Sequence, residues 1–257
     1  MEFVLTETKN RIARITLNRP EKRNALNAQF VNELKTAFTD AINNTEAKVI
    51  LLKANGKAFC AGADLEYLQQ LQQNTYEENL EDSTSLMELY KLLYTCPKLV
   101  IAQVEGHAIA GGCGLITVCD YVIATRGSKF GYTETKIGFV PAIVMTFLIR
   151  KLGEAKARKL LLKADLISAV AAQKMGLIYK CAFPETIESA IDKLCREILE
   201  ENSADALSMT KEMIAKIQAM NLEDALTYAA QMNAKARETT DCKNGITAFL
   251  NKESIKW

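Results

Sequence analysis

The sequence has one histidine, one tryptophan and four prolines among 257 residues, and its formal net charge is only +1. A Ser-His-Asp triad would have to use His107, and a zinc site that needs two or three imidazoles is excluded. Lys+Arg number 32 against 31 Asp+Glu, so the chain lacks the basic excess that nucleic-acid-binding proteins carry. Acid–base chemistry is therefore expected to fall to carboxylates.

The seven cysteines are scattered, odd in number and without a C-x-x-C pair, which argues against a disulfide framework or a zinc ribbon. The N-terminus, Met1-Glu2-Phe3-Val4, has neither the basic nor the apolar region of a signal peptide. No apolar run approaches the roughly 20 residues that a membrane-spanning helix needs. These features predict a cytoplasmic protein that uses neither a membrane nor a nucleic acid as its partner.

Strands and helices alternate through the first two-thirds of the chain. Hydrophobic periodicity predicts strands over 11–17, 48–54, 98–104 and 120–125, and helices after the N-cap Asn27 and over 80–94. This order is typical of an α/β fold with parallel strands. Past about residue 185 the pattern is only helical, with the third of these helices beginning at Asn221. We expect a core of about 195 residues and an all-helical tail.

Two glycine-containing segments follow predicted strands and precede predicted helices. One is GHAIAGGCG, residues 106–114, and the other is AFCAGADL, residues 58–65. Glycines at such junctions allow close approach of a ligand to the backbone and to the free N–H groups of a first helical turn. Tight packing of helix on sheet explains the same glycines. If both segments aim one N–H into a shared cleft, the pair forms an oxyanion hole.

Four motifs in this order resemble the enoyl-CoA hydratase/isomerase (crotonase) family over essentially the whole chain. They are NRPEKRNAL (18–26), FCAGADL (59–65), EGHAIAGG followed by CD (105–120) and FGYTE (130–134). The resemblance implies a crotonase-like ββα spiral core over 1–195 and a C-terminal all-helical trimerisation region over 196–257. It implies no cofactor beyond the coenzyme A of an acyl-CoA substrate, and a homotrimer or a hexamer built as a dimer of trimers.

The resemblance also implies thioester enolate chemistry, with the oxyanion N–H groups belonging to Ala63 and Gly111 and with Glu134 as the acid/base. Hydratases of the family carry a second catalytic glutamate, and this chain has Gly114 at that position. One carboxylate suffices to move a proton between two carbons, so Gly114 favours isomerisation, whereas family naming favours hydration. On this reasoning Gly114→Glu should raise hydratase activity if the backbone tolerates it.

A second departure lies after Glu134, where many relatives have Pro-Gly-x-Gly-Gly and this chain has PAIVM, residues 141–145. We expect this segment to be helical and apolar and to shape the acyl pocket. For coenzyme A, the resemblance implies contacts from residues near the first two motifs. It also implies that the tail residues of an A-F-x-x-K pattern contact the coenzyme A of a neighbouring subunit. These candidates are Arg23, Ala25, Ala61, Asp64, Leu65, Phe249 and Lys252, with Lys22 beside the 3′-phosphate.

Other functions remain open at this stage. Cys113 at a predicted helix start and His107 suggest a Cys–His hydrolase, although no third partner is recognised. A non-catalytic acyl-CoA-binding protein and a hydrolase or decarboxylase of the same family fit the same motifs. Phosphate loops of nucleotide-dependent enzymes are absent. The leading expectation is an enoyl-CoA hydratase or isomerase of fatty-acid or branched-chain acyl-CoA metabolism, in which Asp64 also suits a helix cap.

Overall fold

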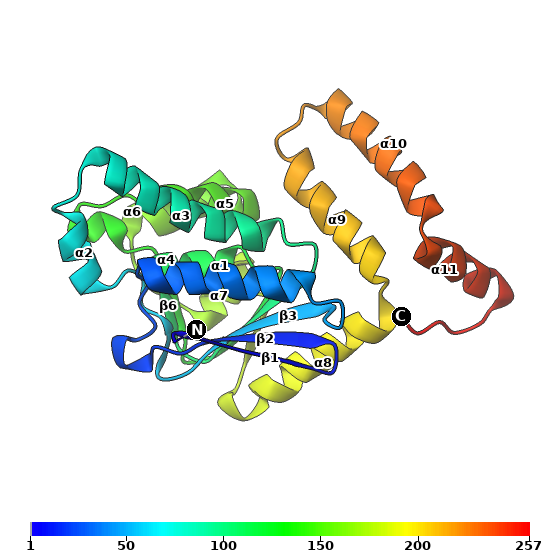
Figure 1. Ribbon diagram of the computed structural model, residues 1–257, viewed down its shortest axis with the longest axis horizontal. Helices are drawn as coiled ribbons and strands as arrows, with labels where there is room; N and C mark the ends of the chain where they lie inside the picture. Colours follow the sequence, from blue (N-terminus) through cyan, green and yellow to red (C-terminus); the bar gives the residue numbers. More distant parts are fainter. Residues whose placement is uncertain (1) are drawn as a thin grey trace.

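The computed structural model describes residues 2–257, and within them it confirms an α/β fold followed by helices only (Figure 1). The larger sheet has the order β1-β2-β3-β5-β7-β10, and all neighbours except the antiparallel β1 and β2 are parallel. Its strands are β1 (Val4–Lys9), β2 (Ile12–Leu17), β3 (Val49–Ala54), β5 (Leu99–Val104), β7 (Tyr121–Thr125) and β10 (Lys180–Ala182).

A smaller sheet stands beside it in the order β4-β6-β8-β9. Its strands are β4 (Ala58–Cys60), β6 (His107–Ile109), β8 (Lys129–Gly131) and β9 (Ile167–Ser168). Strands β3, β5 and β7 of the larger sheet are followed by β4, β6 and β8 of the smaller sheet, respectively. The chain therefore passes from the larger sheet to the smaller one three times. The residues that follow β4, β6 and β8 consequently emerge beside one another.

Two helices begin at the caps that the sequence predicts. Asn27 caps α1 by accepting a hydrogen bond from the Phe30 N–H at 2.9 Å, and Asn221 caps α10 through the Asp224 N–H. The helices are α1 (Ala28–Asn43), α2 (Leu65–Leu71), α3 (Tyr76–Tyr94), α4 (Gly111–Thr117), α5 (Ala142–Leu152), α6 (Glu154–Lys163), α7 (Ala169–Met175), α8 (Ile187–Glu201), α9 (Ala204–Ile217), α10 (Leu222–Glu238) and α11 (Thr240–Asn251).

The larger sheet is buried on both faces because successive residues of each strand point to opposite sides. Ile50 and Leu52 belong to the core formed with helices α1 and α3, whereas Val49 and Leu51 pack with α8. Helix α8 contributes Ile187, Ile191, Leu194, Cys195 and Ile198 to that second layer. The expected boundary between 195 and 196 thus falls inside α8, and α9 is the first helix that leaves the sheet.

Helices α9, α10 and α11 extend away from the two sheets (Figure 1). One buried ion pair fastens the base of this tail, since the Lys211 ammonium lies 2.6 Å from a carboxylate oxygen of Asp120. Lys211 also donates to the carbonyl of Lys98, and its exposed fraction is 6%. At the other end of the tail, Arg11 donates to the carbonyl of Trp257 at 2.8 Å.

Over residues 2–257, none of the helices is long and apolar enough to cross a membrane. Cys60, Cys96, Cys113, Cys119, Cys181, Cys195 and Cys242 are all free thiols, as their scattered spacing predicts.

The Lys211–Asp120 pair can be tested by replacing Lys211 with methionine, which keeps most of the length of the side chain and removes its charge. Leaving Asp120 without its buried partner should lower the free energy of unfolding by about 3 kcal/mol. The matched control is Lys216→Met, which breaks a surface pair with Glu212 on the same helix and should change stability little. Urea denaturation measures both, and equal stability of the two variants would contradict the role of Lys211.

Candidate active site

The two glycine-containing loops lie side by side because the short strands that precede them are paired. β4 and β6 run parallel, with Ala58 opposite His107 and Cys60 opposite Ala108. The chain then leaves β4 through residues 61–64 into α2, and leaves β6 through Ala110 into α4. The pairing confirms that both segments are strand-to-helix junctions.

The contact between the loops is made by backbone atoms. A Cβ placed on Gly112 would lie 2.3 Å from the carbonyl oxygen of Cys60, closer than any side chain allows. A Cβ placed on Gly62 would lie 3.0 Å from the Cβ of Ala110 and 3.8 Å from the nitrogen of Gly111. Gly62 also has φ of +98°, a left-handed conformation that favours glycine. The glycines therefore serve tight packing and loop convergence together.

This packing leaves two N–H groups without acceptors. Ala63 forms a bridge with Leu26, but the bonds of that bridge are made by the N–H groups of Leu26 and Asp64. Gly111 is the first residue of α4, where an N–H has no acceptor within the helix. Among the described residues, neither the Ala63 nor the Gly111 N–H donates a hydrogen bond. Two free donors on neighbouring loops fit a negatively charged oxygen.

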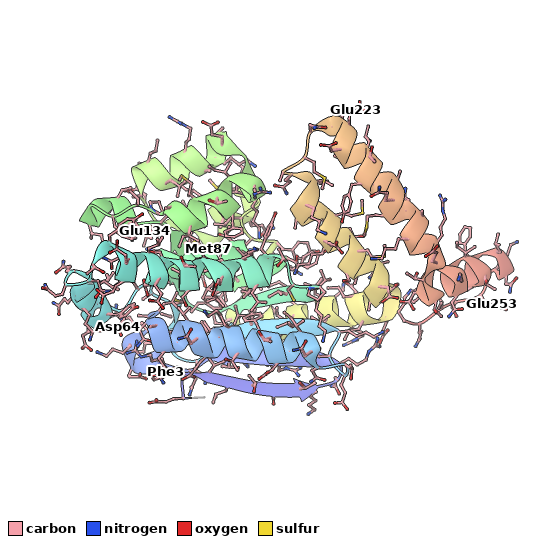
Figure 2. The ribbon with its side chains drawn as sticks, turned by 45° about the horizontal axis from the view of Figure 1, so that its top comes forward. Phe3, Asp64, Met87, Glu134, Glu223 and Glu253 are labelled. Atoms are coloured by element: carbon pink, nitrogen blue, oxygen red, sulfur yellow. The ribbon has the colours of Figure 1, made fainter. Side chains whose placement is uncertain are left out.

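Glu134 lies at the start of a 3-10 turn that follows β8, the third strand to lead out of the larger sheet. Its carboxylate oxygen Oε2 is buried and has no hydrogen-bond partner within residues 2–257. Burial raises the pKa of the Glu134 carboxyl above its ordinary value of 4.5, because desolvation disfavours the charged form. Glu134 and Asp64, which follows Ala63, lie toward the same end of the molecule (Figure 2). A raised pKa suits a carboxylate that takes up a proton near neutral pH.

The two departures from the family pattern meet at one contact. Residues 142–145 are helical, as expected, and form the start of α5. A Cβ placed on Gly114 would lie 2.4 Å from Cγ1 of Val144 and 3.0 Å from the Tyr90 hydroxyl oxygen. The expectation that Gly114→Glu adds a working carboxylate needs correction, because Val144 and Tyr90 already occupy the space beside Gly114.

The coenzyme A candidates near the first two motifs differ in exposure. Arg23 is exposed and left-handed, with φ of 53°, and its carbonyl accepts the Ala61 N–H at 3.1 Å. Ala25 is buried, whereas Leu65 at the start of α2 is exposed. Arg23, Ala61 and Leu65 are therefore the members of this group that present atoms to a ligand.

The side chain of Asp64 is already used within the protein. One carboxylate oxygen accepts the N–H groups of Glu66 and Tyr67 and so caps α2, as the alternative interpretation expected. The other lies 2.5 Å from the Arg19 guanidinium, and Arg19 also donates to the carbonyl of Ala25. Hydrogen bonds from Arg19 and the helix lower the pKa of Asp64 despite its burial, which raises it. Asp64 holds the loop to the first motif.

Phe249 and Lys252 lie in α11 and its C-cap, and Phe249 is 81% exposed. Their neighbour Glu253 stands at the opposite end of the molecule from Glu134 and Asp64 (Figure 2). A single chain therefore does not bring these two residues to the loops.

The Cys–His alternative does not fit the structure. Burial raises the pKa of the Cys113 thiol to about 12, so the reactive thiolate is disfavoured at neutral pH. His107 is exposed on β6, where its ring nitrogen Nδ1 accepts the Lys129 N–H. No group of three or more His, Cys, Asp or Glu among the described residues is placed to hold a metal ion.

Four further residues contribute to the site but were not among the candidates named from the sequence. Arg19 and Asn24 are buried polar anchors of the first motif, and Asn24 donates to the carbonyls of Asn55 and Ala58, both at 2.9 Å. Tyr90 donates to the carbonyl of Gly111, and Val144 packs on Gly114. The buried polar pair belongs to the first motif and could have been proposed from it. Tyr90 and Val144 look like ordinary members of helical apolar stripes.

The contact between Gly114 and Val144 predicts a specific stability pattern. Gly114→Ala should destabilise the protein by about 1–3 kcal/mol, because the added methyl group overpacks a rigid β-branched neighbour. The double variant Gly114→Ala/Val144→Ala should recover part of this loss. Gly127→Ala is the control, since a Cβ there meets nothing within 4 Å. Equal unfolding free energies for Gly114→Ala and Gly127→Ala in urea denaturation would refute the contact.

Comparison with known proteins gives one consistent result. A family profile described as Enoyl-CoA hydratase/isomerase matches residues 7–257. A Thermus thermophilus protein named "Putative enoyl-CoA hydratase" is 41% identical over 245 residues, which cover 95% of this chain and 96% of that protein. "Crotonyl-CoA hydratase" of Syntrophomonas wolfei is 32% identical over 258 residues, 100% of this chain and 98% of that protein. A Shewanella pealeana enoyl-CoA hydratase structure superposes with a TM-score of 0.93 at 27% identity, covering 99% of this chain and 96% of that one. This chain belongs to the enoyl-CoA hydratase/isomerase family.

Proposed function

We propose that this protein is an enoyl-CoA hydratase in which Glu134 is the only acid/base carboxylate and the Ala63 and Gly111 N–H groups bind the thioester oxygen. The observation that supports this most directly is the combination of two unsatisfied N–H donors with a buried carboxylate that has no partner. A buried polar atom without a partner, such as Oε2 of Glu134, is rare in folded proteins, and a bound substrate that satisfies it explains why it persists here. The names of the similar proteins favour hydration.

In this mechanism the thioester carbonyl oxygen accepts both N–H groups, which stabilise the negative charge that develops there. Loss of one such donor typically raises the barrier by about 2.7–4 kcal/mol. Glu134 takes a proton from a water molecule as the water oxygen bonds to C3, and the electron pair of the double bond moves to the thioester as an enolate. The carboxylic acid then gives its proton to C2, so that one water is added and Glu134 returns to its starting state.

Double-bond isomerisation is the second candidate, and Gly114 is the observation that favours it. A 3-enoyl-CoA loses a proton from C2 to Glu134 and regains it at C4, again through the enolate. This reaction needs no second carboxylate. The Thermus thermophilus and Syntrophomonas wolfei relatives give isomerisation no support, since their names specify hydratases.

For coenzyme A we propose contacts with the exposed Lys22 and Arg23, with Ala61 and with Leu65. Lys22 is paired with Glu66 at 2.5 Å on the surface, and a bound 3′-phosphate would compete for it. Phe249 and Lys252 would act on the coenzyme A of another copy, because they lie far from the loops of their own chain.

We further propose that the tail helices assemble the chain into trimers or hexamers in the cytoplasm. The tail exposes several large apolar side chains that a partner would cover: Ile214, Leu222, Leu226, Ile246, Phe249 and Leu250. Light scattering of the purified protein measures the assembly directly.

The two candidate reactions are separated by offering crotonyl-CoA and a 3-enoyl-CoA in parallel assays. The proposal predicts that the protein hydrates crotonyl-CoA at a substantial rate, and that the product is a 3-hydroxyacyl-CoA detected by chromatography. Conversion of the 3-enoyl-CoA to the 2-enoyl-CoA without hydration would support the isomerase instead. Turnover of neither thioester would reject both.

Replacement of Glu134 by glutamine tests the carboxylate and also separates an enzyme from a protein that only binds acyl-CoA. The kcat should fall by about 10²–10⁴ because the proton carrier is lost. Glu154→Gln, at an exposed glutamate in α6, is the matched control and should behave as wild type. Undiminished turnover in Glu134→Gln would show that another group moves the proton.

The pH dependence has a definite sign. Because burial raises the pKa of Glu134, its base form is lost as pH falls through a midpoint above the ordinary 4.5. The kcat/KM should therefore drop on the acidic side at that higher midpoint. The folded state also holds the proton more tightly than the unfolded chain, so ionised Glu134 destabilises the fold above pH 4.5. The Tm of Glu134→Gln relative to wild type should thus rise with pH, and a constant difference would contradict the shift.

A further inference from the structure

The turn that presents the Gly111 N–H is strained. Ala110 has φ of 50° and ψ of −121°, a conformation that residues with a side chain rarely adopt. Gly111, Gly112 and Gly114 follow it, and glycine has many accessible conformations. A strained residue followed by flexible ones would relax into another arrangement unless the surroundings hold it. The direction of the Gly111 N–H depends on this turn staying in place.

Backbone contacts hold the residues on both sides of Gly111. The Ala110 N–H donates to the carbonyl of Gly131 at 2.8 Å, and the Gly114 N–H donates to the carbonyl of Ala110 at 2.9 Å. Gly112 is wedged against Cys60, as described above. Gly111 itself is not held by these contacts, because it has no side chain and its N–H is free.

One side chain reaches Gly111. The Tyr90 hydroxyl donates a hydrogen bond to the Gly111 carbonyl oxygen at 2.8 Å, across 21 residues of sequence. Within the described residues it is the only side chain that forms a hydrogen bond with residues 110 or 111. A Cβ placed on Gly111 would lie 3.1 Å from the same hydroxyl, so the ring sits directly against this turn.

Tyr90 is itself rigidly placed. It lies in α3, it is fully buried, and its ring packs edge-on against Phe147 of α5 with centroids 6.4 Å apart. Burial raises the pKa of its hydroxyl well above 10, so the group remains a hydrogen-bond donor throughout the pH range in which Glu134 titrates. A fixed and permanently protonated donor is suited to orienting a peptide group.

We propose that Tyr90 is a positioning residue, whose hydroxyl fixes Gly111 so that the Gly111 N–H points at the oxygen of the bound acyl-CoA. The inference rests on the proposed function, because it assumes that this N–H binds a thioester. Tyr90 does not act on the substrate in this proposal. It acts through the backbone of Gly111 and makes the oxyanion donor available without reorganisation.

The test is Tyr90→Phe in the full chain, assayed with whichever of crotonyl-CoA or the 3-enoyl-CoA the wild type converts. The kcat should fall by about 10–10², since a misplaced donor loses much of its effect in the transition state. The KM should change much less, and the acidic midpoint of the pH profile should stay where it is, because the Tyr90 hydroxyl forms no hydrogen bond with Glu134. A merely structural change would not split kcat from KM in this way.

Tyr132→Phe is the matched control. Tyr132 is also fully buried, but its hydroxyl pairs with Thr117 at 2.5 Å and with the Cys113 thiol, and it forms no hydrogen bond with residue 110 or 111. This variant should lose Tm as Tyr90→Phe does and keep its kcat. Equal kcat for Tyr90→Phe and wild type would overturn the proposal, as would equal losses of kcat in the two tyrosine variants.

A second variant keeps the test decisive if Tyr90→Phe fails to fold. Incorporation of 4-aminophenylalanine at position 90 retains an N–H donor on a ring of the same shape, so turnover should be largely retained. A folded variant of this kind with turnover lost would overturn the proposal. Absence of turnover in the wild type would reject the proposed function instead, so the two failures are distinguishable.

Discussion

The site depends on the close approach of two backbone segments, the end of β4 and the start of α4. Gly112 lies so near the Cys60 carbonyl that a Cβ would stand 2.3 Å from it. This approach places Gly62 against Ala110 and so sets Ala63 and Gly111 on neighbouring loops. The donors are therefore supplied by the path of the chain, and no particular side chain at 63 or 111 is required for them. A chain with a single histidine and a net charge of +1 can carry such a site.

Desolvation links the parts of this arrangement. Glu134 is partly buried, and burial removes part of the hydration of its carboxylate. Glu134 shows this effect in its buried oxygen without a partner and in its raised pKa. Exclusion of water by a bound substrate strengthens a hydrogen bond from a free N–H to a developing negative charge. Hydrogen bonds of Arg19, Asn24 and Asp64 hold the loop region together and offset the groups left unsatisfied.

The sequence predicts the fold where hydrophobic periodicity is strong. β2, β3, β5, β7 and helix α3 begin and end within a few residues of their expected positions, and α1 and α10 begin directly after their expected caps. β1 has no readable alternation, because after Val4 the strand is exposed at the edge of the sheet. β4, β6 and β8 have three residues each, too few for a period to appear. Helix α11 follows α10 without a connecting loop that would mark its start.

The site is predictable to the extent that it is carried by local motifs. Glycines at strand ends indicate two loops with free N–H groups, and the family resemblance implies Ala63, Gly111 and the Glu134 of FGYTE. The partners Tyr90 and Val144 come from helices remote in sequence, and their significance lies in what they touch. Asp64 is the opposite case. Its motif suggests a contact with a ligand, but its carboxylate oxygens cap α2 and pair with Arg19. Gly114 and Val144 were separate departures in sequence and are one contact in space.

The most direct test of the account is the infrared spectrum of a bound acyl-CoA whose thioester carbonyl carries ¹³C. A saturated, unreactive thioester such as butyryl-CoA reports the ground-state contact without turnover. If the Ala63 and Gly111 N–H groups both donate to the thioester oxygen, the labelled carbonyl stretch moves to lower frequency on binding, relative to the thioester in water. A bound thioester whose carbonyl absorbs at or above its frequency in water would contradict the central claim.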